Sequence, residues 1–256
     1  MASGSLTIVG TGIQLATQLT PEARSAIERA DAFYYLAAEP ASMLWLSELN
    51  PRSRSLHVHY GDGVDRADTY EAMVEELLAE VRRGSDVCAA FYGHPGVFVT
   101  PSHEAIRRAR DEGFPARMLP AVSALDCLFA DLGLDPAGWG LLCYESTDFL
   151  LRARTPDLTA ALVLLQIGAV GTRDASRQAQ PRALELLVER LERFYPSAHE
   201  VVVYEASPYP VAAARIERIP LHDLAATRLT PSSTLYVPPA DLAVPDPEVA
   251  ALLSSG

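Results

Sequence analysis

Strand and helix signals alternate along this chain of 256 residues, which predicts an α/β fold with mostly parallel sheets covered by helices. Two observations carry this prediction. Short apolar runs typical of buried strands are separated by amphipathic segments with helix caps, and the whole pattern starts again after Pro120. Apolar residues make up 49% of the chain and charged residues 21%, so the sequence is too apolar for a disordered protein.

In the first half, helix signals stand between three apolar runs. Thr20 and Pro21 supply an N-cap and a first-turn proline for a helix that runs through about Ala30. Apolar residues then recur at helical spacing over 70–81, and Gly84 ends that helix. The pattern predicts strands at 5–10, 32–36 and 86–92, and a further helix near 102–112.

The second half repeats the pattern. Ser123 is an N-cap candidate for a helix through Leu132, and 118–123 is the expected hinge between two lobes. We therefore expect lobes at 1–119 and 120–239, and a partly ordered tail at 240–256. Further strands are predicted at 140–144, 161–167, 200–205 and 233–237, and a helix at 181–194.

Composition excludes several classes of function. The formal net charge of -12 argues against sequence-independent nucleic-acid binding, which needs a basic surface. The chain contains no lysine, so Schiff-base chemistry, pyridoxal phosphate enzymes and Walker-type phosphate loops are excluded. Cys88, Cys127 and Cys143 lack metal-ligand spacing, so we expect no metal site. No signal peptide and no apolar run near 18 residues is present, so we expect a cytoplasmic protein with no membrane association.

Two loops follow predicted strands. Gly10-Thr11-Gly12 lets a ligand approach the backbone, but a dinucleotide-binding turn would need a third glycine where Leu15 stands, so NAD binding is disfavoured. A tight turn without a ligand is the plainer interpretation of this motif alone. The loop at 91–98, FYGHPGVF, combines glycines with apolar and aromatic neighbours, as in a pocket wall. His94 has no partner at metal-ligand spacing, so a hydrogen-bonding or backbone role is favoured.

Tyr60, Arg66 and Tyr70 form a third motif. Tyr70 fits the apolar face of its helix, and a core role is the plain alternative. Arg66 stands near the start of that helix, where a cation opposes the helix dipole and therefore indicates a nearby partner or ligand. A guanidinium beside a phenol lowers the phenol pKa, so such a pair is a plausible general base.

Several stretches between Gly4 and Pro239 carry a resemblance to a known family. They are GSLTIVGTGI, R-x-x-T-Y, FYGHPGVFV, ARMLP, VSALDCLFADL, CYESTDFL, VLLQIGAVG, VERLERFY and STLYVPP. On these motifs the chain resembles the tetrapyrrole methylase superfamily and, within it, the borosin-type (omphalotin-class) peptide backbone N-methyltransferases. The resemblance implies a two-lobed class III methyltransferase fold that binds S-adenosylmethionine between its lobes and releases S-adenosylhomocysteine.

The resemblance also implies roles for individual residues. Tyr60 would be the base or its relay, activated by Arg66, Tyr70 would hydrogen-bond the developing oxyanion, and Tyr92 would orient the methyl group. The implied cofactor-binding residues are Gly10, Gly12, Tyr92, His94, Val97, Ser123, Ala124, Gln166, Ala206, Ser233 and Thr234.

The chain departs from the fungal members in two places. His59 precedes Tyr60 where those sequences have another aromatic residue, and 61–64 is altered. The tail ALLSSG lacks an apolar core peptide, so we expect a split form that acts on a separately encoded precursor peptide with a leader. The family also implies a homodimer that binds two precursors. A small-molecule methyltransferase of the tetrapyrrole type and a non-catalytic protein that binds peptide or cofactor remain as alternatives.

Overall fold

The computed structural model describes residues 4–61, 63–172 and 178–254. The chain divides into two compact units, each with its own sheet and core. Unit 1 consists of the described residues up to Gly133 together with Glu205–Arg215, and unit 2 contains the other described residues. Among the described residues, no helix combines the length and apolar character needed to cross a membrane.

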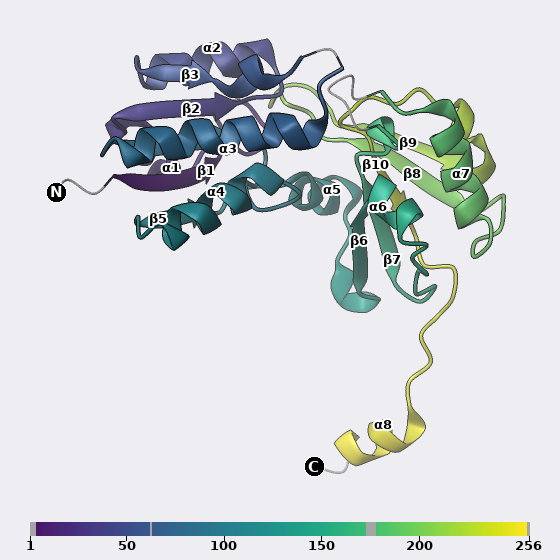
Figure 1. Ribbon diagram of the computed structural model, residues 1–256. Coiled ribbons are helices and arrows are strands. Elements are labelled where there is room, and N and C mark those ends of the chain that lie inside the picture. The colour runs from purple at the N-terminus through teal and green to yellow at the C-terminus, as the bar shows by residue number, and fades with distance from the viewer. Residues whose placement is uncertain (1–3, 62, 173–177, 255–256) are drawn as a thin grey trace. The chain divides into compact units, whose positions relative to one another are not determined.

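Unit 1 contains a parallel sheet of five strands in the order β3-β2-β4-β1-β5 (Figure 1). Its register aligns the last residues of the strands, because Phe91 pairs with both Gly10 and Leu36, and Leu119 pairs with Val9. The carboxyl ends of the strands therefore meet at one edge, where ligands bind in open α/β sheets. The strands are β1 (Ser5–Gly10), β2 (Ala32–Leu36), β3 (Ser53–Ser55), β4 (Asp86–Phe91) and β5 (Ala116–Leu119).

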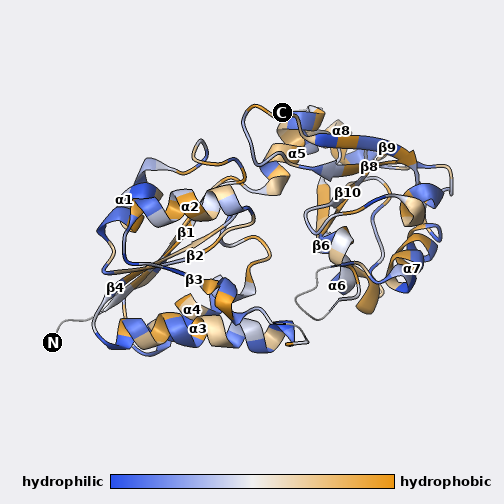
Figure 2. Ribbon diagram, turned by 90° about the horizontal axis from the view of Figure 1, so that it is seen from above, coloured by the Kyte–Doolittle hydropathy of each residue, from blue (hydrophilic) through white to orange (hydrophobic). Residues whose placement is uncertain are grey.

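Helices cover both faces of this sheet because its strands bury apolar side chains on both sides. Leu6 and Ile8 pack with α3 and α4, whereas Val9 packs with α1 and α2. Figure 2 shows α3 with polar and apolar residues in alternating patches, as expected for a helix with one buried face. The helices of unit 1 are α1 (Pro21–Arg29), α2 (Pro40–Leu49), η1 (Leu56–His59), α3 (Arg66–Arg82), α4 (Thr100–Asp111) and α5 (Ala124–Leu132).

Unit 2 contains a mixed sheet of five strands in the order β6-β7-β10-β8-β9. Strand β6 runs parallel to β7, and β10 is antiparallel to both β7 and β8. The strands are β6 (Leu141–Glu145), β7 (Ala161–Leu165), β8 (Glu200–Glu205), β9 (Arg215–Pro220) and β10 (Thr234–Val237). The helices are η2 (Pro136–Gly138), α6 (Ser146–Leu151), η3 (Ile167–Ala169), α7 (Pro181–Leu191), η4 (Leu221–Ala226) and α8 (Pro247–Ser254).

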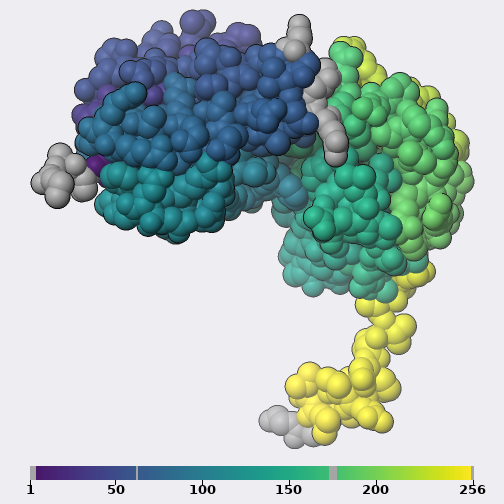
Figure 3. All heavy atoms as spheres, viewed as in Figure 1, coloured from purple at the N-terminus to yellow at the C-terminus, as the bar shows by residue number. Residues whose placement is uncertain are grey.

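The predicted α/β class is confirmed, and every strand and helix expected from the sequence is present within a few residues. Helices α2, α6 and α8 and strands β3, β5 and β9 were not expected. The expected hinge at 118–123 overlaps β5, and the units divide after Gly133, so that α5 belongs to unit 1. The tail contains α8, whose residues are all exposed (Figure 3).

Candidate functional site

The carboxyl edge of the unit 1 sheet brings together most of the residues predicted from the first half of the sequence. Gly10 ends β1, and Tyr92 directly follows β4. The backbone N–H of Thr11 donates to the carbonyl of Phe91 at 2.9 Å, and that of Tyr92 donates to the carbonyl of Leu36 at 3.1 Å. Three neighbouring strands therefore deliver their loops to one place.

The glycines of two loops contact each other directly. Gly12 and Gly93 form an isolated antiparallel bridge, with N–H to carbonyl distances of 3.3 Å and 2.8 Å. Both adopt the left-handed backbone, with φ of 71° and 70°, which favours glycine. A Cβ on Gly10 would lie 2.3 Å from the carbonyl oxygen of Gly93 and 2.5 Å from the Cβ of Ala121. Larger residues at Gly10 would therefore separate the loops after β1, β4 and β5.

Two histidines hold the GHPG loop. His94 Nδ1 accepts a hydrogen bond from the backbone N–H of Gly96 at 2.9 Å, so in the neutral ring the proton is on Nε2. His103 donates from Nε2 to the carbonyl of Gly96, also at 2.9 Å. Among the described residues, no group of three or more His, Cys, Asp or Glu side chains could hold a metal ion. The hydrogen bond from Gly96 ties the His94 ring to its own loop.

Gln18 stabilises the loop after β1 and was not singled out from the sequence. Its Oε1 accepts hydrogen bonds from the backbone N–H groups of Ile13 at 2.7 Å and Gln14 at 2.9 Å. Its Nε2 lies 3.8 Å from the Sγ of Cys127 on α5. Its contact with Cys127 leaves no local pattern in the sequence, because the two positions are more than a hundred residues apart.

Ser123 and Ala124 begin α5 at the same edge. Ser123 forms a capping box with Asp126: its backbone N–H donates to Oδ2 at 2.7 Å, and its Oγ accepts from the Asp126 N–H at 3.3 Å. This places Ala124 as the first helical residue. Val97 directly follows the GHPG sequence and adds an apolar side chain to this edge.

Tyr60, Arg66 and Tyr70 lie on η1 and α3. Tyr60 follows η1, Arg66 is the first residue of α3, and Tyr70 lies one turn further along. Asp65 caps the helix by accepting the N–H of Ala67 at 2.8 Å. Tyr60 and Tyr70 are half-buried against the core that α3 and α4 share, and Arg66 is also half-buried. Arg66 is thus more enclosed than a solvated residue at a helix start.

A second tyrosine–arginine pair lies on the neighbouring strands. Arg54 Nη1 donates to the phenol oxygen of buried Tyr34 at 2.9 Å. Burial raises the pKa of Tyr34 and outweighs the opposing effect of the Arg54 charge. The Tyr34 phenol therefore stays protonated and does not act as a base.

The thiols are also unreactive at neutral pH. Burial raises the pKa of Cys88 to about 12 and that of Cys143 to about 11. Burial likewise raises the pKa of Cys127. Because the thiolate is the nucleophilic form, none of the three thiols suits covalent catalysis.

A second group of predicted residues lies where β7 and β8 end and β10 begins. Gln166 follows β7, Ser233 and Thr234 lie at the start of β10, and Ala206 follows β8. The Ile167 N–H donates to the carbonyl of Ser233 at 3.1 Å. The antiparallel register of β10 with both neighbours places these four residues at one edge of the sheet.

Gln166 has an unusual backbone. Its φ of 61° and ψ of 33° are left-handed, a conformation that L-residues adopt at an energetic cost. The Ser146 hydroxyl donates to its carbonyl at 3.1 Å, and Ala169 N–H donates to the same carbonyl at 2.9 Å. The surrounding structure thus holds a strained residue in place, which is a frequent property of ligand sites.

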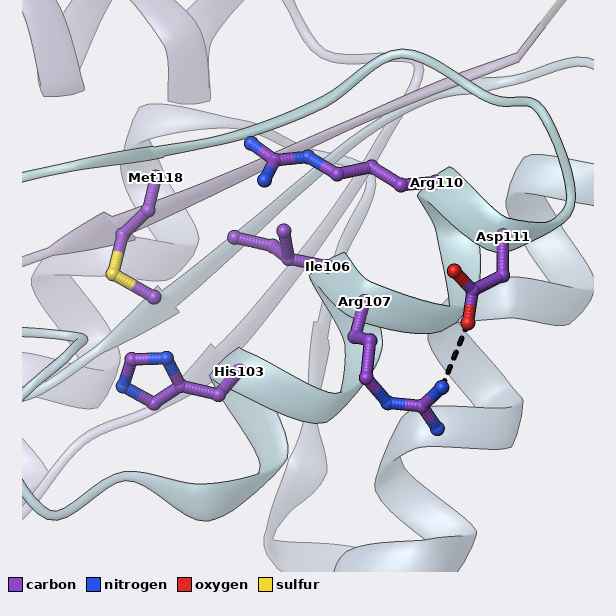
Figure 4. Close-up of a pocket in the computed structure, with 6 residues that line it drawn as sticks. All are labelled: His103, Ile106, Arg107, Arg110, Asp111 and Met118. Carbon is purple, nitrogen blue, oxygen red and sulfur yellow. Dashed lines mark hydrogen bonds and ion pairs between the residues drawn. The ribbon is translucent and has the colours of Figure 1, made fainter.

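A surface hollow of about 360 Å³ lies beside the GHPG loop in unit 1 (Figure 4). Its basic side chains already have partners, because Arg107 pairs with Asp111 at 2.7 Å and Arg110 donates to the carbonyl of Ala116 at 2.8 Å. None of the predicted site residues lines it. It is formed by His103, Ile106, Arg107, Arg110, Asp111 and Met118.

Comparison with known proteins identifies relatives of the whole chain. The profile of the tetrapyrrole (corrin/porphyrin) methylases matches residues 5–224. The chain is 41% identical over 252 residues to a methyltransferase/ribosomally synthesized cyclic peptide gymnopeptides precursor of Gymnopus fusipes. It is 43% identical over 242 residues to the corresponding omphalotin A precursor of Omphalotus olearius. These matches cover 96% and 93% of this chain but 60% and 58% of the relatives, so it spans about three-fifths of their length.

Solved structures share the fold at lower identity. The uroporphyrin-III-C-methyltransferase of Thermus thermophilus matches with a TM-score of 0.68 and 22% identity, over 98% of both chains. A diphthine synthase matches with a TM-score of 0.63 and 15% identity, over 94% of this chain and 92% of its own. At these identities the similarity concerns the fold alone.

Proposed function

The chain belongs to the tetrapyrrole (corrin/porphyrin) methylase family, and from this premise we propose that it methylates backbone amide nitrogens of a precursor peptide with S-adenosylmethionine. The observation that carries the proposal is the arrangement of Gly12, Tyr92 and His94 at the edge that also receives η1 and Tyr60. The two cyclic peptide precursors described above support the peptide substrate, because each is named as a methyltransferase and a precursor together.

The residues at the strand ends suit an S-adenosyl ligand. Such a ligand carries a positively charged sulfonium, an adenine ring and a polar amino-acid end, so it needs a lining with both apolar and polar groups. Backbone groups of the glycine loops, the His94 ring and the buried hydroxyls at the start of β10 offer polar contacts. We propose that the cofactor is held by Gly10, Gly12, Tyr92, His94, Val97, Ser123, Ala124, Gln166, Ala206, Ser233 and Thr234.

The proposed chemistry starts from a poor nucleophile. The lone pair of an amide nitrogen is delocalised into the carbonyl, so the N–H proton must leave before methylation. When bound, S-adenosylmethionine supplies an electrophilic methyl group on a positively charged sulfur. In this proposal Tyr60, activated by Arg66, removes the proton or relays it, a role that contributes about 10²–10⁴-fold.

The other two tyrosines complete the proposed site. Tyr70 and Arg66 donate hydrogen bonds to the amide oxygen, which carries most of the developing negative charge, and such a donor supplies about 3 kcal/mol. Tyr92 orients the reacting groups, so part of the acceleration comes from position. No step in this scheme uses a metal ion.

The decisive experiment is mass spectrometry of a precursor peptide with a helical leader and an apolar core after incubation with the protein and S-adenosylmethionine. We expect mass increments of one CH2 that tandem spectra assign to backbone amides. Methylation of a tetrapyrrole but not of the peptide would favour the small-molecule alternative. Binding of peptide or cofactor without any methylation would favour the non-catalytic alternative.

Cofactor binding is tested separately. S-adenosylhomocysteine should raise the melting temperature, because a ligand selective for the folded state stabilises it. NAD serves as the control and should cause no shift. Equal shifts with both ligands, or none with saturating S-adenosylhomocysteine, would contradict the cofactor assignment.

The supply of the peptide in trans and a homodimer remain predictions. A leader that docks away from the site raises the local concentration of the core peptide. We therefore expect a precursor with its leader to be methylated at several amides, and the bare core peptide at equal concentration to react poorly. Methyl groups on residues 240–256 of this chain would contradict supply in trans, and light scattering of the purified protein tests the dimer.

A further inference from the structure

The short segment that carries Tyr60 is anchored to the end of β2. His57 donates from Nε2 to the carbonyl of Ala37 at 2.8 Å, directly beyond the strand. The backbone N–H of Tyr60 donates to the carbonyl of His57 at 3.0 Å, and the two rings lie 5.9 Å apart. These contacts therefore fix the position of Tyr60 relative to the end of β2.

On the other side the same segment is tied to α3 through His59, the residue directly before Tyr60. His59 Nε2 donates to Oε2 of Glu76 at 2.5 Å. The hydroxyl of buried Thr69 lies 3.4 Å from the carbonyl oxygen of His59. One side-chain contact and one backbone contact thus connect this residue to a single helix.

The surroundings of His59 and Glu76 favour a fixed geometry for the hydrogen bond between them. The side chains are 21% and 30% exposed, so water screens this contact less than it screens most ion pairs on the surface. Glu76 also lies near Tyr34, whose pKa it helps to raise, and that phenol is held by Arg54. The Glu76 carboxylate therefore lies near a phenol that is itself held by a hydrogen bond.

We propose that His59 and Glu76 are positioning residues for Tyr60 in methyl transfer, an inference that rests on the proposed function. Their hydrogen bond holds the backbone before Tyr60 against the helix whose first two turns carry Arg66 and Tyr70. Without it the phenol remains in the fold but samples more positions relative to the guanidinium. Small displacements of a catalytic group reduce the rate strongly without a matching loss of binding.

The test is a double-mutant cycle with Glu76→Gln, His59→Gln and the double variant. We expect each single variant to lower kcat about tenfold or more, with the KM for the peptide and the Kd for S-adenosylhomocysteine changed less than about twofold. Because both changes break the same contact, the double variant should lose little more than either single variant. Melting temperatures show whether each variant is folded at the assay temperature.

Glu75→Gln is the matched control. Glu75 is the neighbouring carboxylate on α3, and it pairs with Arg82 and Arg108, each at 3.0 Å. It should leave kcat within about twofold of the wild type. An equal loss of kcat in the control would show a general effect of weakening α3 and would overturn the inference.

Two further results separate this inference from the proposed function. If the wild type methylates the peptide and both single variants do so at the same rate, the positioning role alone is overturned. Absence of any peptide methylation by the folded wild type overturns the proposed function and the positioning role together. If the losses of kcat multiply in the double variant, the joint role of His59 and Glu76 is also overturned, because the two residues would then act independently.

Discussion

Four residues with side chains adopt a left-handed backbone among those described: Ala16, Phe98, Ala153 and Gln166. Phe98 follows the GHPG loop, and Gln166 is a proposed cofactor contact. L-residues disfavour this conformation by about 1–2 kcal/mol, and such strain concentrates at functional sites. At Gln166 the backbone strain affects stability, whereas the side chain would affect ligand binding, so substitutions there test the two effects separately.

We expect Gln166→Gly to be more stable than Gln166→Ala by about 1 kcal/mol, because glycine adopts φ of 61° without steric strain. Both variants should bind S-adenosylhomocysteine more weakly than the wild type because they lack the carboxamide. Urea unfolding and calorimetry measure the two effects. Ala153→Gly, at φ of 48°, is the control and should leave binding unchanged.

Arg66 tests the proposed chemistry at the same scale. Arg66→Lys keeps the charge but loses the planar pair of donors, and the two residues are not interchangeable at such sites. We expect it to abolish most peptide methylation while the Kd for S-adenosylhomocysteine stays within a few-fold. Near-normal turnover would show that the guanidinium is dispensable.

At the scale of elements, an ion-pair network joins α3 and α4. Arg108 on α4 pairs with Glu71 at 2.6 Å and Glu75 at 3.0 Å on α3. Arg82 near the end of α3 pairs with Glu75 and, beyond α4, with Glu112. Because α3 carries Arg66 and α4 follows the GHPG loop, this network links the two helices that flank the proposed site.

Removal of Arg108 should weaken this contact. We expect Arg108→Gln to lower the melting temperature by several degrees at low salt, and the effect should shrink at high salt as the charges are screened. Arg24→Gln, which breaks a single exposed pair with Glu28 on α1, should have little effect. A salt-independent loss in Arg108→Gln would indicate packing of its aliphatic part instead.

At the scale of the whole molecule, paired carboxylates determine the acid limit of stability. Hydrogen bonds from Arg107 and Arg108 lower the pKa of Glu104 from 4.5 to about 2. Arg82 lowers the pKa of Glu112, and Arg152 lowers that of Asp148. A carboxyl group with a lowered pKa in the folded state stabilises the fold above its unfolded pKa and loses this contribution as the pH falls.

We therefore expect the melting temperature to fall progressively between about pH 4.5 and pH 2, and these carboxylates to cause little change above about pH 5. Thermal unfolding followed by circular dichroism across this range measures the effect. A constant melting temperature down to pH 2 would contradict the ion-pair assignment. Arg107→Gln should make the decline smaller and end it at a higher pH, because it removes a cause of the low pKa of Glu104 in the folded state.

The class of fold and the order of most elements could be predicted from the amino-acid sequence alone. Buried strands such as β4 and β7 are continuous apolar runs, and Thr20 and Ser123 act as the caps that local patterns predict. These signals are local, because burial on both faces and the unpaired groups at helix ends depend on neighbouring residues. The loops at the strand ends were recognisable for the same reason.

The pairing of strands and the contacts between distant side chains could not be predicted in this way and come from the three-dimensional structure. Strands β3 and β5 have three and four residues and no strong apolar pattern, so only their pairing with β2 and β1 defines them. The same holds for the contact of His59 with Glu76, which lies 17 residues away. Contacts across sheets and between helices leave no period in the sequence, because they depend on the position of whole elements rather than on local propensity.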